Sequence, residues 1–243
     1  MRSLSAAEIL EAWERGIAQS SHQRALELLS YAYPETSSNS LSGLSIGQRD
    51  AELLALRERT FGPEMAAMAV CPQCGRQSDI TLNTAEMRSI AIPEPVQTME
   101  LTMAGYDLRF RLPNSDDLVA LTTSDYDECR KQLLGRCLFS LQYDGAPGAL
   151  SELPDEVVDA VSEQMAKADP LADIQLALSC PFCDLGWKAT FDIVSFLWRE
   201  IEALAARLLR DVHALASAYG WRERDILALT PLRRQFYLAL IGI

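Results

Sequence analysis

The sequence predicts an α+β protein that is mostly helical, with two cysteine-bearing β-hairpins and an inserted helical segment between them. Apolar residues recur at three- and four-residue steps through most of the chain, as they do in amphipathic helices. Two Cys-Pro-x-Cys turns interrupt this pattern, and short strand-like stretches flank each turn. The expected regions are an N-terminal helical region (1–64), a first cysteine turn with a β-hairpin (65–112), the inserted helical segment (113–176), a second cysteine turn (177–195) and C-terminal helices (196–243).

The N-terminal region is predicted to hold three helices. Ser5 followed by Glu8 forms a capping-box pattern at the start of the first helix. A second apolar stripe lies at residues 25–29, and a third helix spans residues 46–61 before a Gly-Pro stop. Between them, Pro34–Ser45 is polar, rich in helix breakers and aperiodic, so we expect an exposed loop there.

The middle of the chain mixes strands and helices. Both cysteine turns lie in a strand–turn–strand pattern, and residues 97–113 alternate around Ala104-Gly105 as a hairpin with one wet face. Residues 114–141 then predict one or two helices capped by Asn114 or Ser115. A further helix is expected at residues 154–170.

The last part of the chain is helical. An apolar stripe from Leu197 to Leu215 predicts one long helix that Gly220 ends. A short helix follows, and Thr230 with Pro231 marks the start of a terminal helix.

Composition and charge narrow the function classes. The chain has 243 residues, 49% of them hydrophobic, which is enough for a sizeable core. Its formal net charge of −12 disfavours non-specific nucleic-acid binding. The sequence predicts no membrane span and no secretory signal, so we expect a cytoplasmic protein in which paired cysteines are more often metal ligands than disulfides.

Four of the six cysteines stand in two matched turns, "CPQCG" at 71–75 and "CPFCDLG" at 180–186. Two thiolates separated by two residues can face one metal ion, and two such knuckles complete a four-sulfur tetrahedron that suits zinc. The sequence therefore predicts one structural Zn²⁺ per chain in a zinc-ribbon-like unit. Two unrelated buried cysteine pairs and a redox-active Cys-x-x-Cys are the alternatives; a catalytic zinc fits less well, because four sulfurs leave no open position. The predicted ligands are Cys71, Cys74, Cys180 and Cys183.

No catalytic constellation stands out elsewhere, and the chain is predicted not to be an enzyme. His22 and His213 are expected to be ordinary helix residues, and Cys129 and Cys137 to be buried core thiols. Clustered carboxylates, such as Asp116-Asp117, are expected at helix starts or on solvated faces, where they complement helix dipoles.

The C-terminal helices resemble a helix-turn-helix in outline, but the net charge makes DNA binding there the weaker interpretation. A docking surface for a protein partner is the alternative. The candidate partner-binding residues are Trp221, Arg233, Arg234, Phe236 and Tyr237.

Several stretches resemble a known family: "GLSIGQRDAELLALRERTFG" before the first knuckle, "RFRLPNSDDLVAL" at the start of the insert, and "CPFCDLGWKATFDIVSFLWREI" running into the C-terminal helices. The series is similar to the T-even-phage-like contractile-tail baseplate proteins and baseplate hub assembly chaperones of myophages and phage-tail-like contractile injection systems. The resemblance runs from about Leu41 to the end of the chain. Its diagnostic parts are the knuckles, Arg49-Asp50, Tyr219-Gly220-Trp221 and Arg233-Arg234. The second knuckle departs from the pattern, since Asp184-Leu185-Gly186 replaces a direct Cys-Gly and is expected to loosen the turn.

The resemblance implies a non-enzymatic structural or chaperone-like component of a baseplate. Its partners would be hub, spike, tube or sheath-proximal subunits, with no membrane span and no small-molecule substrate. It would act in the cytoplasm during assembly, and the resemblance does not decide whether the chain stays in the finished particle. The alternative is a zinc-ribbon nucleic-acid or transcription-associated protein, for which Arg76, Arg88 and Lys188 would supply a thin basic face. A metal-dependent or thiol-redox enzyme is the third hypothesis.

Overall fold

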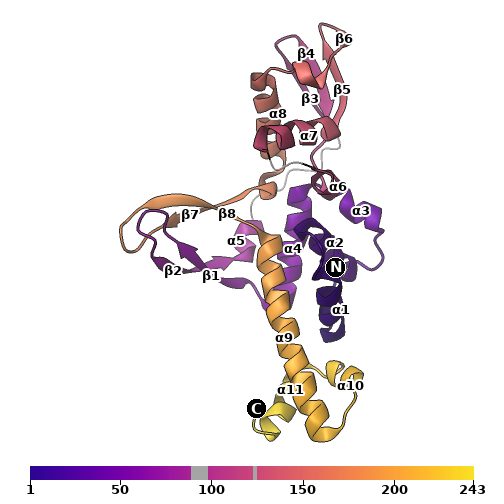
Figure 1. Ribbon diagram of the computed structural model, residues 1–243, viewed down its shortest axis with the longest axis vertical. Helices are drawn as coiled ribbons and strands as arrows, with labels where there is room; N and C mark the ends of the chain where they lie inside the picture. Colours follow the sequence, from indigo (N-terminus) through magenta and orange to yellow (C-terminus); the bar gives the residue numbers. More distant parts are fainter. Residues whose placement is uncertain (89–97, 123–124) are drawn as a thin grey trace.

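The computed structural model describes residues 1–88, 98–122 and 125–243. A helical body lies at the centre, and an arm of two β-hairpins extends from one side of it (Figure 1). An upper lobe of strands and helices stands on one end of the body, and a small C-terminal lobe lies at the far end of the longest helix. This arrangement confirms the predicted α+β class.

The body is built from α1 (Ala6–Gly16), α2 (Ser21–Ala32), α4 (Ile46–Phe61) and the first half of α9 (Ile193–Tyr219). Each of these helices turns one apolar stripe inward, as the sequence periodicity predicts. The stripes meet in the main core, which includes Leu28, Leu29, Leu53, Leu54, Leu56, Leu197 and Ile201.

The helix starts follow the local capping signals. Ser5 accepts a hydrogen bond from the Glu8 amide, and the Glu8 carboxylate accepts one from the Ser5 amide, so the predicted capping box is confirmed. The prediction of an unbroken loop at residues 34–45 is wrong, because α3 (Ser38–Ser42) forms inside it. The physical reason is that Ser37 caps this short helix while Leu41 is buried in the main core.

The arm consists of two separate antiparallel hairpins. The first joins β1 (Glu64–Val70) to β2 (Gln77–Asn83), and the second joins β7 (Ile174–Ser179) to β8 (Gly186–Phe191). Both strand–turn–strand predictions are confirmed. The hairpins are rooted in the main core through Met65 and Ile174, and their tips carry the two cysteine turns.

The upper lobe contains a four-stranded antiparallel sheet in the order β3-β4-β5-β6. Its helices are α7 and α8, which pack on the sheet through a second apolar core. The bounds are β3 Met99–Met103, β4 Tyr106–Phe110, α7 Tyr126–Cys137, β5 Leu138–Tyr143, β6 Ala146–Pro147, the short 3-10 helix η1 Leu150–Glu152, and α8 Asp155–Ala168.

This sheet corrects two sequence expectations. The predicted hairpin around Ala104-Gly105 is present, but it pairs with β5 in this lobe and does not belong with the first cysteine turn. The insert is also not purely helical, since residues expected to continue a helix after Cys137 form β5. The physical reason is that these residues pair with β4, and the Asp144-Gly145 pair, whose φ angles are 46° and 79°, allows a tight turn from β5 into β6.

The upper lobe is tied to the body where α4 begins. The Ile46 amide donates to the Pro113 carbonyl at 3.2 Å, and Ser45 bridges to Asn114 just before α6 (Ser115–Val119). Asn114 caps α6, as predicted. The buried Asp169 carboxylate, next to the 3-10 helix η2 (Pro170–Ala172), accepts a hydrogen bond of 2.9 Å from the Gly47 amide.

Gly47→Ala is expected to weaken this junction. A Cβ atom at Gly47 would lie 2.1 Å from Asp169 Oδ1, so α4 or η2 must shift. We expect a loss of about 1–3 kcal/mol in the free energy of unfolding, the usual cost of overpacking a buried site. Urea unfolding measures this loss, with Gly186→Ala as the control because its Cβ would find no atom closer than 4.0 Å. Equal stability of the two variants would contradict the tight junction.

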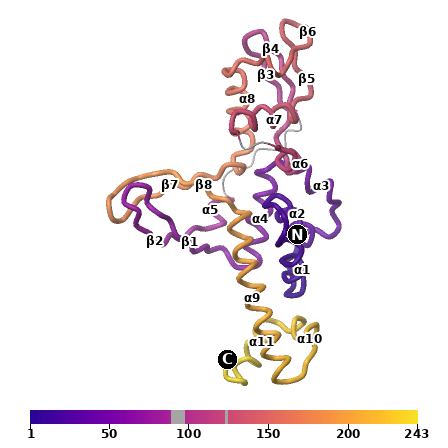
Figure 2. The backbone as a smooth tube through the Cα atoms, in the orientation of Figure 1, coloured from indigo at the N-terminus to yellow at the C-terminus, as the bar shows by residue number. Residues whose placement is uncertain are grey.

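Helix α9 spans 27 residues and connects the body to the C-terminal lobe (Figure 2). Gly220 ends it with φ 68°, as predicted. Charged residues occupy its other faces, and no helix in the described part of the chain is long and apolar enough to cross a membrane.

The C-terminal lobe folds α10 (Glu223–Leu227) and α11 (Pro231–Leu240) back onto the end of α9. Thr230 caps α11 and Pro231 occupies its first position, which confirms the predicted start. A small separate core holds the lobe together; its buried members are Leu215, Ile226 and Leu238.

Candidate metal centre

The two cysteine turns have the same backbone geometry. In the first, the Gly75 amide donates to the Cys71 carbonyl at 3.0 Å; in the second, the Asp184 amide donates to the Cys180 carbonyl at 3.0 Å. Gly75 has φ 69° and Asp184 has φ 57°, a left-handed conformation that aspartate tolerates better than most residues. The departure at Asp184 therefore does not loosen the second turn, contrary to the sequence expectation.

The four sulfurs converge in the space between the two tips. All four lie within 4.8 Å of one another. The Sγ atoms of Cys71 and Cys183 are 3.7 Å apart, and those of Cys74 and Cys180 are 3.6 Å apart. A tetrahedron of sulfurs with Zn–S bonds of about 2.3 Å has edges of about 3.8 Å. The donor set and its spacing therefore fit one metal ion, and the predicted clustering of these cysteines is confirmed.

Protonation of the cluster is uneven. The amide groups of Cys74 and Gln73 donate to the Cys71 sulfur and lower the pKa of Cys71 to about 6. The Leu185 amide favours the Cys183 thiolate, but burial and the neighbouring sulfurs outweigh it and raise the pKa of Cys183 to about 12. One sulfur therefore ionises easily, whereas further thiolates beside it would repel it. A bound dication would remove that repulsion between thiolates.

The surroundings of the cluster do not form a basic face. Arg76 lies over the Phe182 ring at 4.9 Å, and Arg88 pairs with Glu58 at 3.0 Å. Lys188 is exposed on β8 and makes no ion pair or ring contact with the residues that the structure describes. Each cysteine turn also leads into a strand, whereas a redox Cys-x-x-Cys favours a helix N-terminus.

One prediction about the remaining polar residues needs correction, and another is confirmed. Cys137 is buried, and burial raises the pKa of its thiol to about 11, but Cys129 is half-exposed on α7 and is not a core thiol. Asp117 lies in the first turn of α6, as predicted for this pair of carboxylates, and its carboxylate is buried and pairs with Arg111 at 2.9 Å and Arg136 at 3.2 Å. Asp116 beside it is exposed; the two partners of Asp117 are Arg111, in the segment between β4 and α6, and Arg136 on α7.

Neither histidine is placed for general base catalysis. His213 is exposed on α9. His22 is half-buried, its Nδ1 lies 3.3 Å from Arg49 Nη1, and burial together with that cation lowers the pKa of His22. Both are ordinary helix residues, as predicted.

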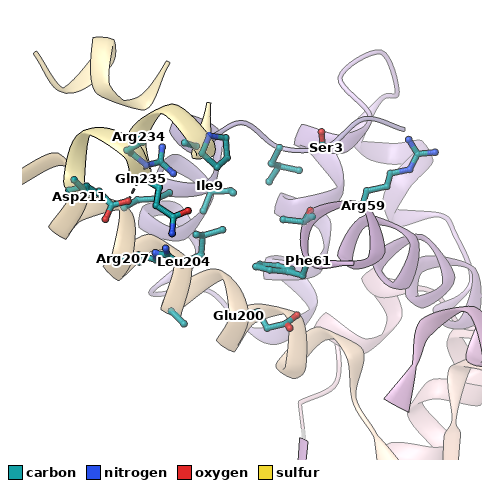
Figure 3. Close-up of a pocket in the computed structure, with 17 residues that line it drawn as sticks. Ser3, Ile9, Arg59, Phe61, Glu200, Leu204, Arg207, Asp211, Arg234 and Gln235 are labelled. Carbon is teal, nitrogen blue, oxygen red and sulfur yellow. Dashed lines mark hydrogen bonds and ion pairs between the residues drawn. The ribbon is translucent and has the colours of Figure 1, made fainter. Parts of the chain in front are cut away.

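A groove of about 720 Å³ separates α9 and α11 from the N-terminal helices (Figure 3). Its carboxylates are already neutralised, since Glu200 pairs with Arg57 at 2.7 Å and Asp211 with Arg234 at 3.0 Å. Among the described residues that line it, there is no cysteine or histidine to act as nucleophile or base.

Of the five candidate partner-binding residues, some pack within the C-terminal lobe and others are exposed. Trp221 stacks on Tyr219 with ring centroids 4.7 Å apart and meets Tyr237 edge-on at 4.9 Å, so these rings pack within the lobe. Arg234 is buried in its pair with Asp211 and fixes α11 on α9, which corrects its expected position on the surface. Arg233 and Phe236 are exposed.

Trp221→Ala is therefore expected to loosen the C-terminal lobe. Losing two ring contacts costs about 1–3 kcal/mol beyond the buried area. Hydrogen exchange should show faster amide exchange in α10 and α11, with little change in the body. Unchanged exchange together with a weaker partner complex would instead give Trp221 the docking role that the sequence suggests.

Comparison with known proteins gives one match. A family model described as T4 bacteriophage base plate protein matches residues 18–198, more than half of the chain. The matched span contains both cysteine turns and the upper lobe. It begins before Leu41 and ends before Tyr219-Gly220-Trp221 and Arg233-Arg234, so those two C-terminal motifs lie outside it. No match was found among curated proteins or among solved structures.

Proposed function

Because the chain belongs to the T4 bacteriophage base plate protein family, we propose that it is a non-enzymatic structural or assembly component of a contractile-tail or injection-system baseplate, stabilised by a four-cysteine zinc site. The observation that carries the proposal is that the family match spans both cysteine turns and the whole segment between them. Four clustered cysteine sulfurs in the described part of the chain also support the proposal, because together they would fill the coordination shell of one tetrahedral ion.

Zinc is the proposed ion. Four sulfur donors at tetrahedral spacing suit an ion that accepts this geometry and needs no redox partner. The ligands would be Cys71, Cys74, Cys180 and Cys183, one ion per chain. The ion would clip the two hairpin tips together and make the arm a rigid projection.

The proposed partners are proteins. The arm, the upper lobe and the C-terminal lobe project in different directions from one body, so one chain can hold several neighbours at once (Figure 1). In a baseplate these neighbours would be hub, spike, tube or sheath-proximal subunits. The chain would meet them in the cytoplasm during assembly, as a chaperone-like factor or as a subunit that stays in the particle.

The test is a native pull-down of the tagged chain from cells that assemble the particle, followed by mass spectrometry. Hub, spike, tube or sheath proteins in the eluate would support the proposal. Comparing the eluate with purified finished particles separates the two roles, because a chaperone is present only in the first. Polymerase subunits or nuclease-sensitive material in place of tail proteins would overturn it in favour of nucleic-acid association.

A further inference from the structure

Helix α11 has two apolar faces, and the structure covers one of them. Leu238 is buried against α9 and α10 in the lobe core. On the opposite side of α11, Leu232 is 79% exposed, Phe236 64% and Leu240 62%, and Ile243 beyond the helix end is 75% exposed. Steps of four residues place the first three on one line along the helix. We call these four residues the α11 stripe.

Exposure of this kind needs a cause. A helix that is apolar on all sides is normally buried on all sides. A contiguous apolar patch on a surface marks a contact site far more often than isolated apolar residues do. Each member of the stripe is more exposed than Leu209 on the neighbouring α9, at 39%. The stripe is therefore the surface of the C-terminal lobe with the most apolar area left to cover.

The charges beside the stripe are positive and unpaired. The segment from Thr230 to Ile243 contains no Asp or Glu side chain. Within the residues that the structure describes, the exposed Arg233 side chain on α11 makes no ion pair, whereas the buried Arg234 is neutralised by Asp211. Arg210 on α9 is likewise exposed and forms no ion pair with the described residues, and it lines a hollow of about 500 Å³ together with Ile243.

We propose that the α11 stripe docks an amphipathic helix of another protein, whose apolar side covers the stripe and whose flanking acidic residues face Arg233 and Arg210. Helix-in-groove recognition uses anchors at the same four-residue spacing. A second copy of this chain fits less well, because two C-terminal lobes meeting through α11 would bury a segment without acidic side chains against itself. That the partner is a baseplate subunit rests on the proposed function. The kind of helix that would bind follows from the surface alone.

The test places a photo-crosslinking phenylalanine analogue at Phe236 in the full chain, in cells that assemble the whole particle. The matched control carries the analogue at Tyr126, which is 77% exposed on α7 in the upper lobe. Mass spectrometry of the cross-linked peptides should identify, from position 236 and not from position 126, a helical segment with apolar residues at three- and four-residue steps flanked by Asp and Glu. Cross-links to a second copy of this chain, to a basic segment, or no more than the control would overturn the proposal.

The affinity of the full chain for the segment identified by cross-linking gives a quantitative test. Phe236→Ala and Leu232→Ala should each weaken binding at least tenfold, as expected for central apolar anchors. Arg233→Gln together with Arg210→Gln should weaken binding and flatten its salt dependence. Gln235→Ala, on the side of α11 that faces the groove in Figure 3, should leave the affinity unchanged, and all variants should keep the wild-type melting temperature because the changed side chains are exposed.

The two proposals fail differently. A chain that co-purifies with tail proteins while position 236 cross-links nothing would remove the docking surface and keep the baseplate function. A cross-link from position 236 to an acidic helix of a protein outside any tail particle would keep the docking surface and remove the baseplate function.

Discussion

Cys180→Ser should release the metal and unfold the arm while the helical body stays folded. A two-stranded hairpin is marginal in water by itself, and the strands of both hairpins alternate exposed and partly covered residues along most of their length. A metal ion held by the four cysteines would also close a long loop between the two cysteine turns. Closing a loop of about 100 residues restricts the unfolded chain by about 4–5 kcal/mol in the chain-entropy view. We therefore expect a loss on the order of 4 kcal/mol, concentrated in the arm.

Metal analysis and hydrogen exchange measure both parts of this prediction. The wild-type chain should carry one zinc, and the variant none. Fast exchange should appear in β1, β2, β7 and β8 but not in α2 or α4, and a chelator should reproduce the pattern. Cys129→Ser is the matched control, because it makes the same chemical change outside the cluster and should keep the zinc. A folded Cys180→Ser chain that retains one tightly bound zinc would disprove the shared four-sulfur site.

The clustering of the four cysteines could be predicted from sequence because its requirements are local. Each knuckle needs two cysteines separated by two residues and then a residue that tolerates positive φ. Both turns contain these residues within five consecutive positions. What the sequence could not show is that Cys74 remains exposed while Cys71 is buried, because that depends on how the two hairpin tips meet.

The same division applies to the fold. Helix starts at Ser5, Asn114 and Thr230 and the helix end at Gly220 follow from neighbouring residues, and all four are confirmed. The misses depend on distant residues. Pairing of β4 with β5 crosses the whole of α6 and α7, and the buried carboxylate of Asp117 is paired with Arg136 from α7 as well as with the nearby Arg111. Periodicity along one element does not contain that information.

Arg49→Met should be among the most destabilising single changes in the body. Arg49 is 3% exposed, and its guanidinium pairs with Asp50 at 2.7 Å and donates to Ser115 Oγ at 3.3 Å. Methionine keeps the length of the side chain but leaves the Asp50 carboxylate buried without its partner. Removing one member of a buried ion pair costs about 3–5 kcal/mol, so urea unfolding should show a loss of that size. Because Ser115 begins α6, hydrogen exchange should also show a looser contact between the body and the upper lobe.

Two further measurements separate the lost charge pairing from a simple packing defect. The double variant Arg49→Met/Asp50→Asn removes both charges and should recover much of the loss, since an uncharged pair leaves no buried ion.

Burial raises the pKa of Asp50 to about 6 against the pull of Arg49, and removing Arg49 should raise it further. A carboxyl group whose pKa is higher in the folded chain than in the unfolded chain takes up its proton first in the folded state, so stability rises as the pH falls toward 5. The deficit of Arg49→Met relative to wild type should thus be smaller at pH 5 than at pH 8, and the double variant should lack this pH dependence. A deficit that stays the same at both pH values, with no recovery in the double variant, would mean that packing and not charge holds this junction.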